Sequence, residues 1–223
     1  MQRSAEQMMQ SEPGQRSRAS IGARRNPEAE AAILAAARAL LAERGYAGFS
    51  IDEVARRAGA GKPTIYRWWP TKADLFMDVY CAEKSAAMPA RKSSGLARDL
   101  TAYTRDLWKF WRETPSGRAF RALIAEAQAN DAALEVLSAK FLPDRTQGVR
   151  AMFNRAAEAG EIEVADVDLL MQLYLGFNWF HLLTGRIDDD PETIRRMTRL
   201  LTGGGAKNAT APRPKRSPRT RPS

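Results

Sequence analysis

Apolar residues recur along most of this chain at intervals of three and four positions, which is the spacing of one face of an α-helix. The first clear case begins at Pro27, a residue suited to a first helical turn, and ends at Gly45. Its apolar stripe consists of Ile33, Leu34, Ala37, Leu40 and Leu41. The chain offers no convincing strand pattern, in which apolar and polar residues would alternate. The sequence therefore predicts an all-α fold.

A second helix is expected to begin at Ile51. Ser50 and Glu53 have the S-x-x-E spacing of a capping box at its start. Apolar residues at positions 51, 54, 55 and 58 again fall on one face. The sequence Gly-Ala-Gly at 59–61 then ends the helix, because glycine adopts the backbone of a tight turn without a steric cost.

A third and very short helix is expected at 62–69. Pro63 lies where a first helical turn tolerates proline, and Pro70 ends the pattern. Thr71 then has the position of a cap for the next helix. Two short helices joined by a glycine turn form a helix-turn-helix, whose second helix enters the major groove of DNA.

Side chains at the start of the third helix suit contact with DNA. Lys62 can donate to guanine O6 or N7, Thr64 can donate, accept or offer its methyl group to thymine, and Pro63 gives apolar contact. The residues better suited to phosphates are Tyr66, Arg67 and Lys72. We expect the first group to read base edges and the second to position the protein.

The segment AGAGKPTIYRWWPTKADL, residues 58–75, resembles the signature of the TetR family of bacterial transcriptional repressors. The specific part of the resemblance covers about residues 31–79. It implies a long fourth helix after the helix-turn-helix and then an all-helical domain that binds a ligand and forms a dimer. The DNA contacts that it implies are Ser50, Lys62, Pro63, Thr64, Tyr66, Trp68 and Lys72.

Two tryptophans of this segment have different meanings within the resemblance. Trp69 matches a buried aromatic position of the family. Trp68 departs from the family pattern, because a smaller polar or imidazole side chain is common at that position.

The remaining pattern divides the chain into four segments with about nine helices in all. After the third helix, we expect helices at about 71–88, 96–113, 118–129 and 131–141, a restart after Pro143 that ends at Gly160, and helices at 167–184 and 191–202. The predicted segments are a flexible basic arm at 1–26, a helix-turn-helix DNA-binding domain at 27–72, a helical effector-binding and dimerisation domain at 73–202, and a disordered basic tail at 203–223.

The second domain has enough aromatic side chains to line an apolar ligand cavity. The candidate ligand-binding residues are Trp108, Trp111, Phe120, Phe153, Phe177, Trp179 and His181. Aromatic residues at helical spacing more often form ordinary core, so this assignment competes with plain packing. His181, the only histidine, is more often an ordinary hydrogen-bonded side chain than a switch.

The apolar run at 169–183 has only 15 residues and contains Gln172, Asn178 and His181, so it is too short and too polar to span a bilayer. Periodicity leaves open whether it is a buried helix or a subunit interface. The TetR resemblance favours an interface in which the last two helices of each subunit form a four-helix bundle. The two recognition helices of such a dimer would lie roughly 34–36 Å apart, on a palindromic operator.

The net charge of +9 is located at the two ends of the chain. Residues 1–26 hold five basic and two acidic residues, and residues 203–223 hold six basic and no acidic ones, which leaves the middle neutral. Such ends attract DNA through salt-sensitive electrostatics, whereas sequence preference must come from the folded part. The arm either contacts DNA through arginines such as Arg18, Arg24 and Arg25 or remains a solvated tail.

These features favour a sequence-specific DNA-binding regulator, in particular a dimeric repressor that a small-molecule effector releases from its operator. The alternatives are a nonspecific nucleoid-type DNA-binding protein and, with less support, an all-helical enzyme. One histidine and one cysteine, Cys81, give no metal-ligand or nucleophile pattern, and we expect no catalytic residues, cofactor or metal. The expected partners are double-stranded DNA, a second copy of the chain and the effector. We expect no membrane partner. The single cysteine fits a bacterial cytoplasmic location, associated with the nucleoid.

Overall fold

A computed structural model describes residues 26–88, 91–188 and 190–204. The predicted basic arm and basic tail lie outside these residues, except for Asn26 at one end and Gly203 and Gly204 at the other. The described residues form helices and connecting turns and contain no strand, which confirms the all-α prediction. None of the helices in these ranges is both long enough and apolar enough to cross a membrane.

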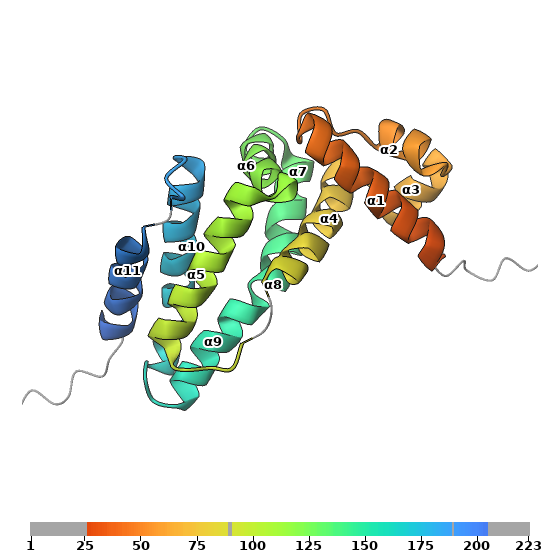
Figure 1. The fold of residues 1–223 in the computed structure, drawn as a ribbon. Coiled ribbons are helices and arrows are strands. Elements are labelled where there is room, and N and C mark those ends of the chain that lie inside the picture. Colours follow the sequence, from red (N-terminus) through yellow and green to blue (C-terminus); the bar gives the residue numbers. More distant parts are fainter. Residues whose placement is uncertain (1–25, 89–90, 189, 205–223) are drawn as a thin grey trace, which may run out of the picture.

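The amino-terminal part of the fold has one long helix, two short ones and a second long helix (Figure 1). These are α1 (Pro27–Arg44), α2 (Ile51–Ala58), α3 (Lys62–Trp68) and α4 (Lys72–Ala87). The sequence pattern predicted all four to within a residue or two. Thr71 and Asp74 cap α4 reciprocally: each accepts a hydrogen bond from the backbone N–H of the other.

The rest of the chain forms a second group of helices that lies beside α4 in Figure 1. These elements are α5 (Leu96–Glu113), α6 (Pro115–Ala127), α7 (Asp131–Glu135), the π-helix η1 (Val136–Phe141), α8 (Leu142–Arg145), α9 (Gln147–Glu158), the 3₁₀-helix η2 (Val164–Asp166), α10 (Val167–Leu183) and α11 (Pro191–Gly204).

Two of these elements differ from the sequence prediction. Helix α6 begins at Pro115 and not near residue 118, because the Thr114 hydroxyl caps it by accepting the N–H of Gly117 at 3.0 Å. The predicted helix at 131–141 changes from α to π geometry before Pro143. Proline has no N–H with which to continue the regular ladder, so irregular geometry is expected just ahead of it.

The buried core of the amino-terminal helices continues into the second group of helices. One cluster of buried side chains extends from Ile33 in α1 through Phe76 and Tyr80 in α4 to Phe120 in α6. It includes Ile33, Ala37, Leu40 and Leu41 of the predicted apolar stripe, and Leu34 of that stripe packs against it while partly buried. The helix-turn-helix contributes Ile51, Val54, Ile65 and Trp69 to the same cluster. A second cluster joins α5, α9 and α10 and contains Phe153 and Tyr174.

Helices α5 and α6 approach each other so closely that only glycine fits at position 117. A β-carbon there would lie 2.3 Å from the Phe110 carbonyl oxygen and 2.6 Å from the Trp111 α-carbon. We expect Gly117→Ala to lower the free energy of unfolding by about 1–3 kcal/mol, because backbone has to move. Thermal or urea unfolding followed by circular dichroism measures the change.

Gly148→Ala is the matched control for this substitution. Gly148 also lies in a helix, α9, but a β-carbon added there meets no atom within 4 Å. We expect it to be neutral or to raise stability by roughly 0.5–1 kcal/mol. Equal effects of the two substitutions would contradict the close approach of α5 and α6.

Candidate functional site

The start of α2 is set by a local cap. The Ser50 hydroxyl accepts a hydrogen bond from the backbone N–H of Glu53 at 3.3 Å. The Glu53 carboxylate does not complete the predicted capping box, because it accepts hydrogen bonds from Arg56 and Arg57. These bonds, that of Arg56 above all, lower the pKa of Glu53 to about 2.

Arg57 connects α2 to α1. Its guanidinium donates to Glu53 on its own helix and to Glu43 of α1, where the Nη2–Oε2 distance is 2.7 Å. Planar guanidinium groups suit such paired contacts with carboxylates. Together with the buried side chains Val54 and Leu40, this contact holds α2 against α1.

Helix α3 is held to the body of the molecule along one face. Ile65 is fully buried, and Trp69, which follows the helix, donates its indole N–H to the Asp78 carboxylate of α4 at 2.7 Å. Gly59 takes the left-handed conformation, with φ +63°, that turns the chain from α2 into α3. With this face buried, the opposite face of α3 points to solvent.

All eight residues predicted to contact DNA lie at the surface of this end of the molecule. Those classed as exposed are Ser50, Lys62, Pro63, Tyr66 and Arg67, and those partly buried are Thr64, Trp68 and Lys72. Tyr66 has 48% of its surface exposed although it is an aromatic residue. The Trp68 ring packs edge-on against Trp69, with 5.7 Å between the ring centroids.

Two of the predicted contacts are already paired with carboxylates, which the sequence did not indicate. The Lys62 ammonium lies 2.8 Å from the Asp52 carboxylate of α2, and both side chains are exposed. The Lys72 ammonium lies 2.8 Å from the Glu126 carboxylate of α6 and 4.4 Å from the centre of the Tyr46 ring. Burial and the nearby Glu126 carboxylate raise the pKa of the Tyr46 hydroxyl.

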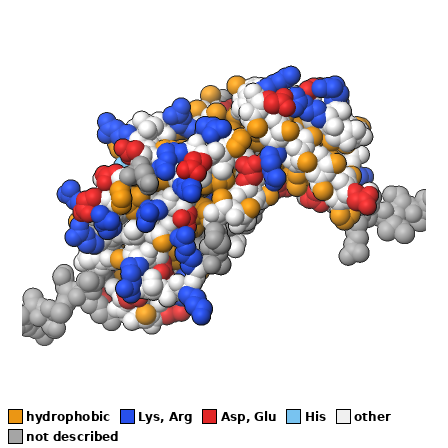
Figure 2. All heavy atoms as spheres, in the orientation of Figure 1, with side chains coloured by type: hydrophobic (Ala, Val, Ile, Leu, Met, Phe, Trp, Pro, Cys, Tyr) orange, Lys and Arg blue, Asp and Glu red, His pale blue; other side chains and the backbone are white. Residues whose placement is uncertain are grey.

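Charges of both signs are interspersed over the face of the molecule in Figure 2, with no large basic surface on that side. This agrees with the neutral charge balance of the chain between its two ends.

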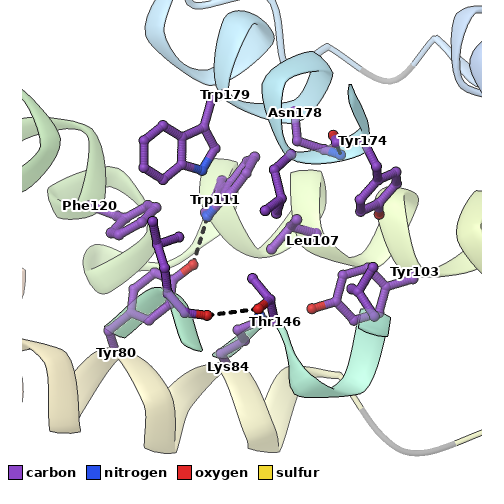
Figure 3. A pocket seen from close by; sticks show the side chains of 13 residues that line it. Tyr80, Lys84, Tyr103, Leu107, Trp111, Phe120, Thr146, Tyr174, Asn178 and Trp179 are labelled. Atoms are coloured by element: carbon purple, nitrogen blue, oxygen red, sulfur yellow. Dashed lines mark hydrogen bonds between the residues drawn. The ribbon is translucent and has the colours of Figure 1, made fainter. Parts of the chain in front are cut away.

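A pocket lies between α4, α5 and α10 (Figure 3). It has a volume of about 440 Å³, including the part open to solvent. Its lining consists of Tyr80, Lys84, Tyr103, Leu107, Trp111, Phe120, Leu142, Thr146, Val149, Tyr174, Leu175, Asn178 and Trp179.

Three of the seven predicted ligand-binding residues line this pocket: Trp111, Phe120 and Trp179. The other four lie outside its lining. Trp108, Phe177 and His181 stack on one another next to it, and Phe153 is fully buried in the second core cluster. His181 makes a hydrogen-bonding contact with the Phe177 carbonyl oxygen at 2.9 Å, as expected for an ordinary helix side chain.

The sequence analysis missed the polar part of the pocket, although a signal was present. Tyr80 and Lys84 have a spacing of four on α4, and Tyr103, Leu107 and Trp111 have the same spacing on α5. Each set marks one helix face. The predicted set contained only Trp, Phe and His residues, so it left out the tyrosines and the polar side chains of the lining.

Two family models match the chain. Residues 33–79 match "Bacterial regulatory proteins, tetR family", and residues 93–201 match "Tetracyclin repressor-like, C-terminal domain". Together they cover most of the chain, including the α2–α3 unit and every lining residue of the pocket except Tyr80 and Lys84.

The chain belongs to the TetR family. As a member, it is a sequence-specific DNA-binding transcriptional regulator, and α3 is the recognition helix of its helix-turn-helix.

Individual TetR-family relatives agree with this assignment. The uncharacterized HTH-type transcriptional regulator YdeS of Bacillus subtilis is 27% identical over 181 residues, which are 80% of this chain and 91% of YdeS. The regulator AqdR of Rhodococcus erythropolis is 28% identical over 65% of this chain and 69% of its own. The crystal structure of the TetR-family regulator SCO0332 is 28% identical and superimposes with a TM-score of 0.66, over 79% of this chain and 98% of that protein.

Proposed function

We propose that this TetR-family protein is a homodimeric repressor that binds a palindromic operator and leaves it when a small-molecule effector binds. The observation that carries the proposal is the geometry of α3, which buries Ile65 while it exposes Lys62 and Tyr66. Such a helix presents donors to a major groove without any rearrangement of the core.

Within this proposal, the eight surface residues divide by role. Lys62, Pro63 and Thr64 lie in the first turn of α3 and contact base edges. The other five bind phosphates and set the orientation of the protein on the duplex: Ser50, Tyr66, Arg67, Trp68 and Lys72. Residues 27–72 act as the DNA-binding domain. Residues 73–202 act as the domain that binds the effector and forms the dimer.

An exposed apolar stripe supports dimerisation through the last two helices. Helix α10 carries four large apolar residues at spacings that place them on one side, and α11 adds a fifth. These are Leu169, Leu173, Phe180, Leu183 and Leu200, with 45–76% of their surfaces exposed. Contiguous apolar surface of this kind usually marks an interaction site. A second copy that pairs its own α10 and α11 with these residues would cover it by two-fold symmetry.

The repressor proposal is tested by titrating the purified protein against genomic DNA fragments at two salt concentrations. We expect the protein to bind a few fragments tightly at both salt concentrations. Uniform binding of every fragment would instead favour the nonspecific nucleoid-type function.

Substitutions in and next to α3 should distinguish residues that contact base edges from residues that contact phosphates. We expect Lys62→Ala and Thr64→Ala to relax sequence preference by about 1–3 kcal/mol at the base pairs that they contact. Tyr66→Phe and Lys72→Ala should weaken binding to all sequences alike, and Lys72→Ala should lower the slope of log affinity against log salt by about one. Fluorescence anisotropy with operator and scrambled duplexes measures both effects. Lys109→Ala, an exposed lysine of α5, is the control and should change neither.

The Lys72–Glu126 pair should compete with DNA for the same ammonium group. We expect Glu126→Gln to raise affinity for operator and scrambled DNA alike by a few-fold, because exposed or half-exposed pairs contribute up to about 1 kcal/mol. The gain should vanish in the Lys72→Ala background. Glu113→Gln, which removes an equivalent carboxylate on α5, should leave affinity unchanged. Weaker DNA binding by Glu126→Gln would mean that Glu126 holds Lys72 in position for DNA and does not compete with DNA for its ammonium group.

A charge within the apolar stripe should break the dimer. We expect Leu173→Glu to shift the protein from dimer to monomer in analytical ultracentrifugation and to weaken operator binding, while circular dichroism remains helical. Leu134→Glu changes a similarly exposed leucine on α7 and should leave the dimer intact. A Leu173→Glu dimer of undiminished stability would place the interface elsewhere.

A further inference from the structure

We propose that the pocket between α4, α5 and α10 binds a small planar aromatic compound with one negative charge, and that Lys84 is the residue that binds the charge. The inference deepens the proposed function and rests on it, because it assigns a chemical class to the effector of the repressor.

Lys84 is the one cationic side chain among the residues that line the pocket. Its side chain is partly buried, and its ammonium lies 5.4 Å from the centre of the Tyr103 ring. Lys62 and Lys72 each have a carboxylate at 2.8 Å, but no carboxylate among the described residues lies within ion-pair distance of Lys84. An anionic ligand in the pocket would supply the counter-charge to this ammonium, and a hydrogen bond between charged groups is stronger than one between neutral groups.

The other polar groups that line the pocket are largely used within the protein. The Tyr174 hydroxyl is hydrogen-bonded to Thr104 at 2.8 Å. Asn178 accepts from the Trp108 indole at 2.8 Å and donates to the Tyr174 carbonyl at 2.9 Å. These bonds fix the walls and leave little polar recognition to them. Charge recognition therefore falls to Lys84, with the Tyr103 hydroxyl pointing into the same space in Figure 3.

Flat rings form most of the remaining surface. The aromatic lining residues are Tyr80, Tyr103, Trp111, Phe120, Tyr174 and Trp179. Ring faces and edges favour contact with another planar ring over a flexible chain. The volume of about 440 Å³ includes open solvent at the mouth, so it sets only an upper limit on the size of the ligand and favours a small one. An aromatic carboxylate meets both the charge and the shape requirement.

The test is calorimetric titration of the full-length protein, without DNA, with four probes: 1-naphthoate, its neutral isostere 1-naphthamide, benzoate and octanoate. We expect naphthoate to bind at least about tenfold more tightly than naphthamide, since a hydrogen bond to a charged group is worth more than one between neutral groups. Octanoate, which has the charge but no ring, should bind more weakly than both aromatic acids.

A charge-removing variant then tests the role of Lys84 itself. In Lys84→Gln the ratio of naphthoate to naphthamide affinity should fall close to one, while naphthamide affinity stays within about twofold. Lys109→Gln changes an exposed lysine on α5 that points away from the face formed by Tyr103, Leu107 and Trp111, and it should retain the wild-type ratio. If Lys84→Gln fails to fold by circular dichroism, the four-probe comparison on the wild-type protein decides alone.

Three outcomes would overturn the inference: equal naphthoate and naphthamide affinities in the wild-type protein, a charge preference that survives in Lys84→Gln, or no binding of either aromatic acid. Tighter binding of octanoate would replace the aromatic class by an aliphatic one and overturn it as well. Operator release is measured separately. If naphthoate binds through its charge but the protein stays on its operator, the effector-controlled repressor proposal is contradicted. The Lys84 binding site is supported in that case.

Discussion

The burial of Ile65 and Trp69 is the interaction on which the DNA-binding end of this protein depends. Helix α3 has only seven residues, and a helix of that length is not stable in water by itself. Its position is set by these two side chains and by the hydrogen bond from Trp69 to Asp78 of α4. The recognition surface is therefore positioned by α4 as much as by α2.

Helix α4 runs from the end of the helix-turn-helix to the wall of the pocket. Thr71 caps its first turn, Lys72 begins it, and Tyr80 and Lys84 lie two and three turns further on in the wall of the pocket. No hinge separates these positions within the helix, and the same buried cluster packs along it from α1 to α6. A change in how the pocket is filled can thus reach the recognition helix through one rigid element, with the contact between Lys72 and Glu126 as a second link.

Much of the fold could be predicted from the sequence, because the decisive signals are local. Ser50, Gly59, Pro63 and Thr71 mark helix ends through caps and turns that involve residues two to four positions away. The apolar periodicity then identifies the buried faces. All eight candidate DNA contacts are exposed or partly buried, and their roles on DNA remain predictions.

The features that escaped prediction depend on residues far apart in the chain. Glu126 meets Lys72 across 54 positions, and Trp108 and Asn178 are 70 positions apart. No capping or periodicity rule connects such pairs, because they arise only when α4, α5, α6 and α10 pack. The pairing of Lys72 with Glu126 was missed for that reason, whereas the polar pocket residues on α4 did leave a helical spacing in the sequence.

The two sides of helix α10 face different surroundings. Asn178 and Trp179 face the pocket, while Phe180 and Leu183 belong to the outward apolar stripe. In the proposed dimer, ligand binding and subunit association therefore share a single helix and become thermodynamically linked. The affinity for an effector would then depend on protein concentration, and a value obtained with dilute protein would not describe the assembled regulator.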